Sequence, residues 1–273
     1  PVHRYDTVAK TWTARADLPT ALTGINAATI GNKIYVPGGI NGFTYFDALH
    51  IYDTATNTWS VGAPLPVKLA WASVVTDQQK LYVIGGMLED ASYSNKVYIY
   101  NPSLASWATG ADMTLGRRYA SAAYIGGKVY VAGGLTAGGA TLNAEVYTIA
   151  ANSWSAAPSL PDGLGNGGWA PYNGGVFDGR YFVVIGGDVD TTECAQIAVM
   201  YDTRDGHWED MGPPNRCLYG TKGAGIGNVY YRLGGRTNEG GIWHFDASTE
   251  YYSLCKGFPW PMFRAATSDL GGQ

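Results

Sequence analysis

Short apolar runs with polar residues at alternate positions recur along the chain, and five of them end in a double glycine. These runs are KIYVPGG (33–39), KLYVIGG (80–86), KVYVAGG (128–134), RYFVVIGG (180–187) and VYYRLGG (229–235). A period of two is typical of a β-strand with two different faces. Glycine permits the positive φ angles of a tight connection, and it leaves space beside the strand. We therefore predict β-strands with negligible helix, and we expect a neighbouring aromatic ring to pack over each double glycine.

An aromatic residue, with Trp or Tyr seven positions later, marks each repeat. The pairs are Tyr5/Trp12, Tyr52/Trp59, Tyr100/Trp107, Tyr147/Trp154, Tyr201/Trp208 and Phe245/Tyr252. Gly38 follows Trp12 by 26 residues (38 − 12), and three later intervals are equal to this one. A short turn such as residues 53–57 would place the two rings opposite each other on consecutive strands. We therefore interpret the aromatic pairs as core packing rather than as a sugar-binding ladder.

The repeated text resembles the Kelch family, in which an apolar strand, Gly-Gly, Tyr-Asp, Trp and a Pro-containing turn follow one another. The stretch HIYDTATNTWSVGAPLP (50–66) shows these features, and the resemblance covers essentially the whole chain. It implies a β-propeller with one four-stranded antiparallel blade per repeat. We predict a single all-β domain, a six-bladed Kelch-type propeller over residues 1–273. The repeats are about 1–18 plus 262–273, 19–63, 64–111, 112–157, 158–212 and 213–256.

One blade is predicted to be shared by the two ends of the sequence. Residues 1–18 would supply its third and fourth strands, and MFRAATSDLGGQ (262–273) would supply its first strand. Its second strand has no counterpart in the sequence. It would come from residues outside this sequence or from another chain, or the blade would keep unpaired edges that invite pairing.

Composition narrows the classes of function. The chain has 273 residues with a formal net charge of −4, and Gly accounts for 38 of them, about twice the usual share. The charge argues against a nucleic-acid partner, which needs a basic face. No apolar run has the length of a membrane helix. Three cysteines are too few for a disulfide scaffold, although Cys194 and Cys217 could pair if their Cα atoms are close. We slightly favour an extracellular or periplasmic location over a cytoplasmic one. We expect the protein to be a monomer or part of a longer chain.

The stretch GLGNGG (163–168) matches a dinucleotide-binding motif, G-x-G-x-x-G. That motif requires a preceding strand and a following helix, and Pro171 is incompatible with the first turns of a helix. The interval from Trp154 to Gly186 is 32 residues (186 − 154), so the stretch is better interpreted as an extended loop that carries Trp169 and Tyr172. No nucleotide or other cofactor is expected.

Two connections in each blade share one end of the sheet: the link from the fourth strand of one blade to the first strand of the next, and the link from the second strand to the third. The resemblance to Kelch proteins implies that this end binds the ligand. Arginines beside aromatic residues suit a carboxylate, because guanidinium binds it through two hydrogen bonds and stacks on rings. The candidate binding residues there are Trp71, Arg118, Tyr119, Trp169, Tyr172, Arg216, Tyr219, Arg236 and Arg264. The same end carries Lys68, Arg117, Phe43, Tyr45, Glu89 and Asp90.

Catalytic chemistry is weakly represented in the sequence. Asp188, Asp190 and Glu193 are weak candidates for a Ca²⁺ site, because further spaced ligands do not follow them; no metal site is predicted. No nucleophile elbow is present, so no catalytic residue is assigned. We predict a binding module for a protein segment or an acidic glycan. The alternative is a mutarotase for sugars of the sialic acid type, which would use the same end and which the resemblance to some bacterial Kelch proteins implies.

Overall fold

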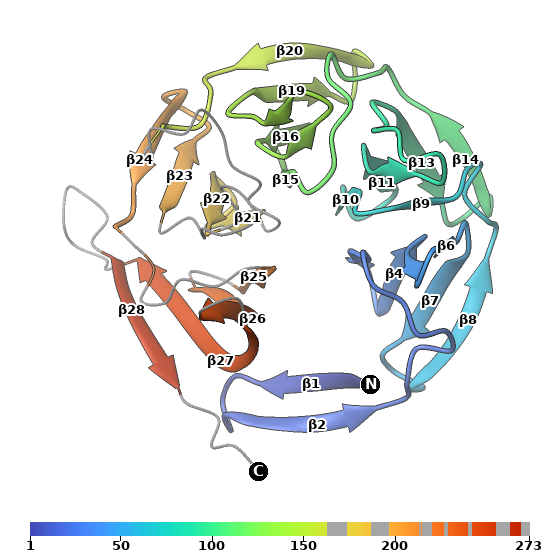
Figure 1. Cartoon of the computed structure of the whole chain (residues 1–273), viewed down its shortest axis with the longest axis horizontal. Coiled ribbons are helices and arrows are strands. Elements are labelled where there is room, and N and C mark those ends of the chain that lie inside the picture. Colours follow the sequence, from blue (N-terminus) through green and yellow to red (C-terminus); the bar gives the residue numbers. More distant parts are fainter. Residues whose placement is uncertain are drawn as a thin grey trace. The chain divides into compact units, whose positions relative to one another are not determined.

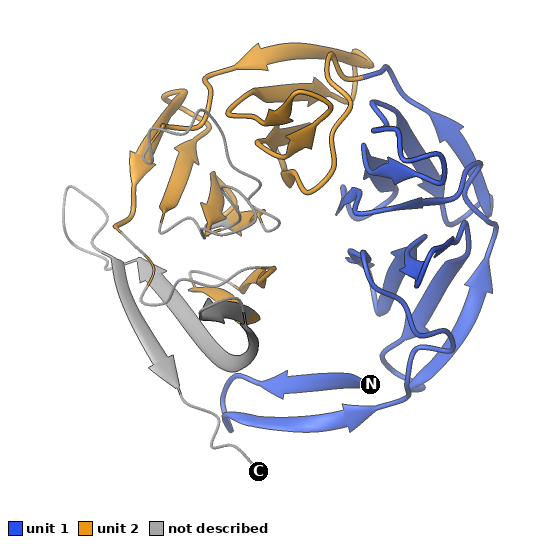
Figure 2. Cartoon of the chain, in the orientation of Figure 1, with its two compact units in different colours: residues 1–112 blue, residues 113–273 orange. Residues whose placement is uncertain are grey.

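A computed structural model of the chain shows consecutive antiparallel sheets, and no helix occurs in the described part (Figure 1). The described residues are 1–162, 174–186, 197–212, 214, 220–226, 229–239, 242–254 and 263–268, with only the backbone described for residue 177 and from residue 236 onward. Within these ranges the chain contains no helix that could span a membrane. Two compact units, residues 1–112 and 113–273, are distinguished in Figure 2.

The first unit contains two four-stranded sheets, the two-stranded sheet β1–β2 and two shorter two-stranded ribbons. Strands β1 (Val2–Asp6) and β2 (Thr11–Arg15) form the first sheet. The second sheet has the order β3 (Ala28–Ile30), β4 (Lys33–Pro37), β7 (Leu49–Asp53) and β8 (Thr58–Gly62). The third sheet has the order β10 (Ser73–Thr76), β11 (Leu81–Ile84), β13 (Val97–Asn101) and β14 (Ser106–Thr109). Short ribbons pair β5 (Ile40–Asn41) with β6 (Thr44–Tyr45), and β9 (Leu69–Ala70) with β12 (Met87–Leu88).

The second unit contains three four-stranded sheets in the described residues. The first has β15 (Ser121–Ile125), β16 (Lys128–Ala132), β19 (Ala144–Thr148) and β20 (Ser153–Ala157), with a ribbon of β17 (Leu135–Thr136) and β18 (Gly139–Ala140). The next has β21 (Gly174–Phe177), β22 (Tyr181–Ile185), β23 (Ala198–Asp202) and β24 (His207–Asp210). The last has β25 (Lys222–Ile226), β26 (Val229–Glu239), β27 (Ile242–Leu254) and β28 (Phe263–Ser268).

The turns between third and fourth strands repeat one local structure. Each contains a residue with positive φ five positions after the repeat aromatic: Lys10, Asn57, Ala105, Asn152 and Gly206. Asn and Gly tolerate this conformation better than other residues. In the second sheet, the Tyr52 hydroxyl donates to Asn57 Oδ1 at 2.6 Å, and the backbone N–H of Ala55 donates to Asp53 Oδ1 at 2.9 Å. The turn therefore places Tyr52 directly opposite Trp59 in the register of the sheet.

The predicted cross-strand contact is confirmed for five of the aromatic pairs. Their ring centroids are 4.9–5.2 Å apart, in Tyr5/Trp12, Tyr52/Trp59, Tyr100/Trp107, Tyr147/Trp154 and Tyr201/Trp208. Four of these five tyrosines are buried, and Tyr5 is half-buried. Four of the pairs pack in the core as predicted, whereas Trp12 is exposed and the Tyr5/Trp12 pair does not. Neighbouring sheets contribute to the same apolar clusters. One such cluster joins Tyr35 and Leu49 to Leu81 and Tyr100.

The described double glycines have positive φ as expected, but the atoms nearest to the space beside Gly38, Gly39, Gly86 and Gly134 are backbone or aliphatic and not aromatic. A Cβ on Gly86 would lie 2.2 Å from Leu69 Cδ1, and a Cβ on Gly134 would lie 2.8 Å from the carbonyl oxygen of Arg118. Both contacts come from the segment that enters the first strand of the same sheet. Each second glycine therefore lets this segment cross close to the second strand.

The C-terminal segment differs from the sequence-based expectation. Residues Phe263–Ser268 form β28, the fourth strand of the last sheet, paired with β27, and not the first strand of a blade shared with residues 1–18. Phe245 and Tyr252 both lie in the single strand β27 rather than on two strands. At Glu250, the position that corresponds to Asn57, β27 continues and pairs with Arg232. Thr249 and Glu250 pair with β26 on one side and with β28 on the other, and these two ladders hold the chain extended there.

Candidate functional site

The two predicted connections meet at one end of each sheet. Thr23 and Ile40 exchange backbone hydrogen bonds of 2.8 and 2.9 Å, and Arg118 and Leu135 exchange bonds of 3.0 and 2.8 Å. In the third sheet the ribbon of β9 and β12 makes the equivalent contact. We call this the connection end of a sheet. Its backbone groups are largely satisfied by one another, so it presents side chains on a fixed frame.

Four repeats place a left-handed residue at the same position, just before the first strand. The residues are Gly24 (φ 65°), Trp71 (φ 57°), Tyr119 (φ 61°) and Gly220 (φ 61°). Glycine adopts this conformation without strain, whereas an L-residue pays about 1–2 kcal/mol. Such strain is concentrated at functional sites, where the surrounding structure holds it. Trp71 and Tyr119 therefore stand out from their repeat counterparts.

Trp71 lies in an aromatic cluster of the first unit. Its backbone N–H donates to the carbonyl of Gly24 at 2.7 Å, and its indole covers that glycine so closely that a Cβ there would be 2.8 Å from Nε1. The Tyr45 ring meets the indole edge-on, with 6.1 Å between centroids. Ile40 and Met87 complete the cluster. The half-buried indole is held in one orientation, which lowers the entropy cost of stacking a ligand on it.

Arg118 and Tyr119 form the corresponding feature of the second unit. The guanidinium carbon of Arg118 lies 4.6 Å from the centre of the Tyr119 ring, a cation–π contact. Both side chains are half-buried. A guanidinium that stacks on a ring can bind a carboxylate in its own plane. The predicted combination of arginine and aromatic ring is therefore present at this position.

Arg117, which the sequence analysis placed among the residues offered to a ligand, is instead a buried anchor, with 1% of its surface exposed. It donates to Glu145 Oε1 at 2.5 Å and to the carbonyls of Gly133 and Asn143 at 3.1 and 2.9 Å. Burial holds the pKa of Arg117 below its ordinary value, although the Glu145 carboxylate acts in the opposite direction. These bonds cross the connection end and fix the segment that carries Arg118.

The remaining candidates are described only in part. Arg264 lies within β28, and not in the connection that the sequence analysis assigned to it, and Arg236 lies in β26. The side chains of both lie outside the described part. The other candidates lie outside the described residues altogether: Trp169, Tyr172, Arg216, Tyr219, Asp188, Asp190, Glu193, Cys194 and Cys217. In the described ranges, no three His, Cys, Asp or Glu side chains are grouped so that they could hold a metal ion.

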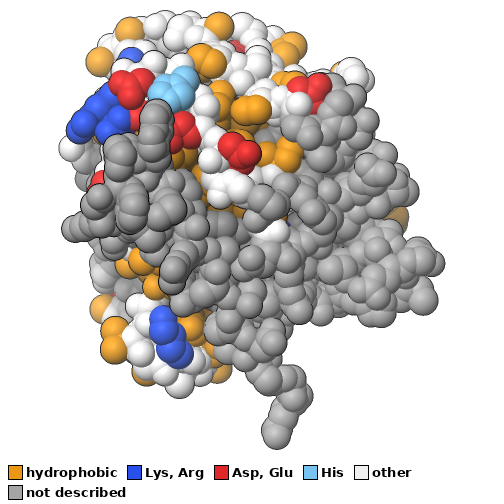
Figure 3. All heavy atoms as spheres, turned by 90° about the vertical axis from the view of Figure 1, so that its left-hand side faces the viewer, with side chains coloured by type: hydrophobic (Ala, Val, Ile, Leu, Met, Phe, Trp, Pro, Cys, Tyr) orange, Lys and Arg blue, Asp and Glu red, His pale blue; other side chains and the backbone are white. Residues whose placement is uncertain are grey.

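Several charged side chains elsewhere lie beside an opposite charge. On the sheet β21–β24, Arg180 pairs with Asp202 and lies 3.5 Å from Asp205, and His207 Nε2 lies 3.2 Å from Glu209. Figure 3, which views the side that includes this sheet, shows acidic and basic side chains close together. The described part of this surface therefore lacks a field of one sign that would attract a charged ligand.

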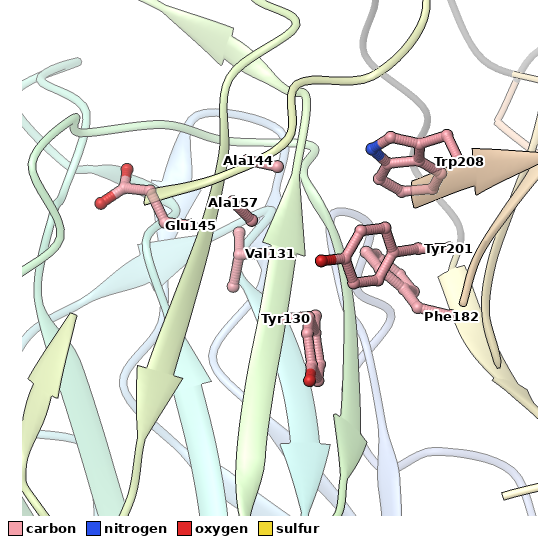
Figure 4. A pocket seen from close by; sticks show the side chains of 8 residues that line it. All are labelled: Tyr130, Val131, Ala144, Glu145, Ala157, Phe182, Tyr201 and Trp208. Atoms are coloured by element: carbon pink, nitrogen blue, oxygen red, sulfur yellow. The ribbon is translucent and has the colours of Figure 1, made fainter. Parts of the chain in front are cut away.

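Two cavities differ greatly in size. In the second unit, a space of about 10 Å³ lies between the sheets β15–β20 and β21–β24, closed by Tyr130, Phe182 and Trp208 (Figure 4). It has room for one water molecule at most. In the first unit, a cavity of about 620 Å³ lies beside the ribbon β1–β2 and reaches Ile40 and Gly42 at the connection end.

The sequence analysis named Trp71 and Tyr119 but missed the backbone conformation that makes them unusual. Aligning the repeats would have shown them in one column with Gly24 and Gly220, and glycine in two repeats indicates a position that favours positive φ. It also missed Gly24 itself, whose lack of a side chain gives the Trp71 indole its place.

Comparison with known proteins supports the propeller prediction. A family model described as "Attractin/LZTR1 beta-propeller" matches residues 1–216. Among solved structures, 466 chains match, including one titled "Structure of YjhT" with a TM-score of 0.79 and 17% sequence identity over 95% of this chain and 88% of that chain. No curated protein matches the sequence. The all-β, Kelch-type propeller fold is confirmed, and the number of blades stays a prediction.

Proposed function

The chain belongs to the Attractin/LZTR1 β-propeller family, and we propose that it is a binding module whose ligand contacts the connection ends of its sheets. One observation carries this proposal. Trp71 and Tyr119 are bulky residues held in a left-handed conformation where two other repeats use glycine. Stability alone favours glycine at such positions, so the aromatic side chains are best explained by a ligand.

The ligand we propose bears carboxylates, as an acidic glycan or an acidic protein segment does. Arg118 is the described basic group that stacks on an aromatic ring at a connection end, and a charge-assisted hydrogen bond from guanidinium to carboxylate is among the stronger polar contacts. We assign the recognition of the carboxylate to Arg118 because its guanidinium is held against the Tyr119 ring at this end of the sheet.

A mutarotase for sugars of the sialic acid type is the alternative at the same end, because Arg118 would also bind the carboxylate of such a sugar. That chemistry needs a group that can donate a proton near neutral pH. Asp90 is a carboxyl group at a connection end, but Ser92 donates hydrogen bonds to it from its hydroxyl at 2.6 Å and from its backbone at 2.9 Å. These bonds hold the pKa of Asp90 below its usual value, so it stays ionised. Asp90 is therefore not the proton donor that this alternative needs, and the mutarotase stays the second proposal.

The test compares Arg118→Ala with Arg204→Ala, which removes the same charge from an exposed turn at the opposite end of its sheet. The probes are an array of sialylated and uronic-acid glycans and a displayed library of random peptides. We expect carboxylate-bearing ligands whose affinity falls about tenfold or more in Arg118→Ala, since a hydrogen bond to a charged group contributes about 1.5–3 kcal/mol. Arg204→Ala should change it less than twofold.

Equal loss of affinity in both variants, or ligands without acidic groups, would contradict the proposed site. The rate of anomer exchange of N-acetylneuraminic acid, followed by proton NMR, distinguishes the mutarotase from the binding role. Acceleration well above buffer that disappears in Arg118→Ala would replace the binding proposal with the mutarotase.

A further inference from the structure

His50 is a buried histidine of strand β7 whose ring nitrogens have no hydrogen-bond partner in the described structure. Its side chain is 5% exposed, and neither Nδ1 nor Nε2 is hydrogen-bonded. The imidazole meets the Trp59 ring edge-on, with 6.3 Å between the ring centroids. A ring of this kind is unusual in a protein interior, where buried polar atoms are normally satisfied.

The repeat shows what this position needs in order to hold a charge. Glu145 is the counterpart of His50, because each lies two residues before the tyrosine of its repeat. The buried Glu145 carboxylate accepts a hydrogen bond from Arg117 at 2.5 Å. In the repeat of His50, Leu22 takes the place of Arg117, since each lies 17 residues before the second glycine (39 − 22 and 134 − 117). A charge on His50 would therefore lack a partner of this kind.

The strands beside His50 present apolar side chains to it. Val36 of β4 and Val61 of β8 lie directly opposite His50 in the register of the sheet, so they share its face. The titratable or charged residues on the surrounding elements are Lys33 of β4, Tyr52 and Asp53 of β7, and Arg15 and Asp17 on either side of Ala16. Burial lowers the pKa of the His50 imidazole, and these groups add no opposing effect.

We propose that His50 is an acid-sensitive switch, whose protonation separates the ribbon β1–β2 from the second sheet. In the imidazolium both ring nitrogens carry a proton, and each N–H then needs an acceptor. Water has to reach the ring, so the Trp59 indole that packs against it has to move. Trp59 Nε1 donates to the carbonyl of Ala16 at 2.8 Å, and the Ala16 N–H donates to Asn57 Oδ1 at 2.9 Å. Movement of the indole therefore breaks the contact that joins the ribbon to the sheet.

The direction of the pH dependence follows from the burial of the ring. Because folding lowers the pKa of His50, the packing keeps its full stability above the pKa of a histidine in the unfolded chain, about 6.5. This stability is lost as pH falls from that value toward the pKa of the folded protein. The switch therefore acts in weak acid. It is independent of the carboxylate site at Arg118, and either proposal can fail alone.

Backbone amide exchange of the intact protein, at about pH 7.5 and about pH 5, tests the switch. The results are expressed as protection factors, which remove the intrinsic pH dependence of exchange. The amides to follow are those of β7, β8 and Ala16. We expect their protection to fall about tenfold or more at the lower pH, because the closed packing excludes the protonated ring.

Two matched variants make the test specific. His50→Val introduces the residue that the repeat uses at Val199, which is 2% exposed, and should keep protection at the two pH values within about twofold. His3 is the equivalent histidine of β1, and its exposed ring lies edge-on to Trp12. Since water already reaches it, His3→Val should behave as the parent chain.

Three results would overturn the proposal: constant protection in the parent chain, an equal loss of protection in His50→Val, or a loss that His3→Val abolishes. A fourth result would do so as well. If β7 and β8 lose protection in acid while the Ala16 amide keeps it, the ribbon stays joined to the sheet and His50 is not a switch.

Discussion

The left-handed conformation at Trp71 predicts an inverted order of stability for two truncations. Trp71→Ala and Trp71→Gly lose the same indole contacts to Gly24 and Tyr45. The difference between their free energies of unfolding therefore reports the backbone conformation at position 71 alone. An L-residue at φ 57° pays about 1–2 kcal/mol that glycine does not. Glycine in turn gains freedom in the unfolded chain, which costs about 0.4–1 kcal/mol. We expect Trp71→Gly to be more stable than Trp71→Ala by about 0.5–1 kcal/mol, the net of these two effects.

A matched pair at Val74, an ordinary position of β10, provides the control. There glycine should be less stable than alanine by about 0.5–1 kcal/mol, because a strand interior gives no advantage to glycine. Urea unfolding of the four variants, with m-values checked for equality, measures both differences. If alanine is at least as stable as glycine at position 71, the position is not strained. The main argument for a ligand-facing role of Trp71 then fails.

Three further predictions concern the frame of the molecule and its turns. Glu145→Gln should destabilise the second unit by about 3–5 kcal/mol in urea unfolding, because the buried Arg117 loses its charged partner. As a control, Glu89→Gln removes the charge from the exposed pair with Lys68 and should cost less than about 1 kcal/mol. Gly225→Ala should destabilise by about 1–3 kcal/mol, since its Cβ would lie 2.0 Å from the carbonyl oxygen of Val176, and Gly138→Ala, with nothing nearer than 3.7 Å, should be within about 0.5 kcal/mol of the parent chain. Hydrogen bonds from the backbone N–H groups of Ala9 and Val8 hold the pKa of Asp6 below its usual value. The carboxylate therefore contributes stability above the pKa of the unfolded chain, and this contribution is lost as pH falls through the pKa of the folded protein. In Asp6→Asn, the free energy of unfolding measured in urea should depend less steeply on pH in this acid range.

Regular spacing made the greater part of the fold predictable. Tyr52 and Trp59 meet across the turn because the turn length and the strand period are both visible in the sequence, and four other pairs follow the same rule. The double glycines in the sequence marked the positions at which the second strands end. What packs on them was not predictable, because a close approach of backbone leaves no mark on the residues that approach. Gly134 shows this, since its neighbour is the carbonyl of Arg118.

The last sheet shows where periodicity was insufficient. Phe245 and Tyr252 keep the seven-residue spacing, yet the chain between them continues as the strand β27. A spacing fixes the distance along the chain, but it does not fix whether the chain reverses within that distance. The turns at Lys10 and Ala105 form without Asn or Gly at the left-handed position, so no single residue type signals the reversal. The assignment of residues 262–273 to a first strand depended on a turn between Phe245 and Tyr252, so both expectations failed together.

Arg117 and Arg118 are adjacent and chemically identical, and the structure gives them opposite roles. Arg117 is buried with Glu145, and Arg118 is stacked on Tyr119. The segment they share is fixed by backbone bonds between Arg118 and Leu135, as its counterpart is fixed between Thr23 and Ile40. Bonds of this kind do not depend on side chains. The residue that follows can therefore be tryptophan, tyrosine or glycine from one repeat to the next while the frame is kept. A binding surface on this frame can change its chemistry at these positions without altering the sheets beneath it, and this is why we assign recognition to Trp71, Arg118 and Tyr119 rather than to the strands.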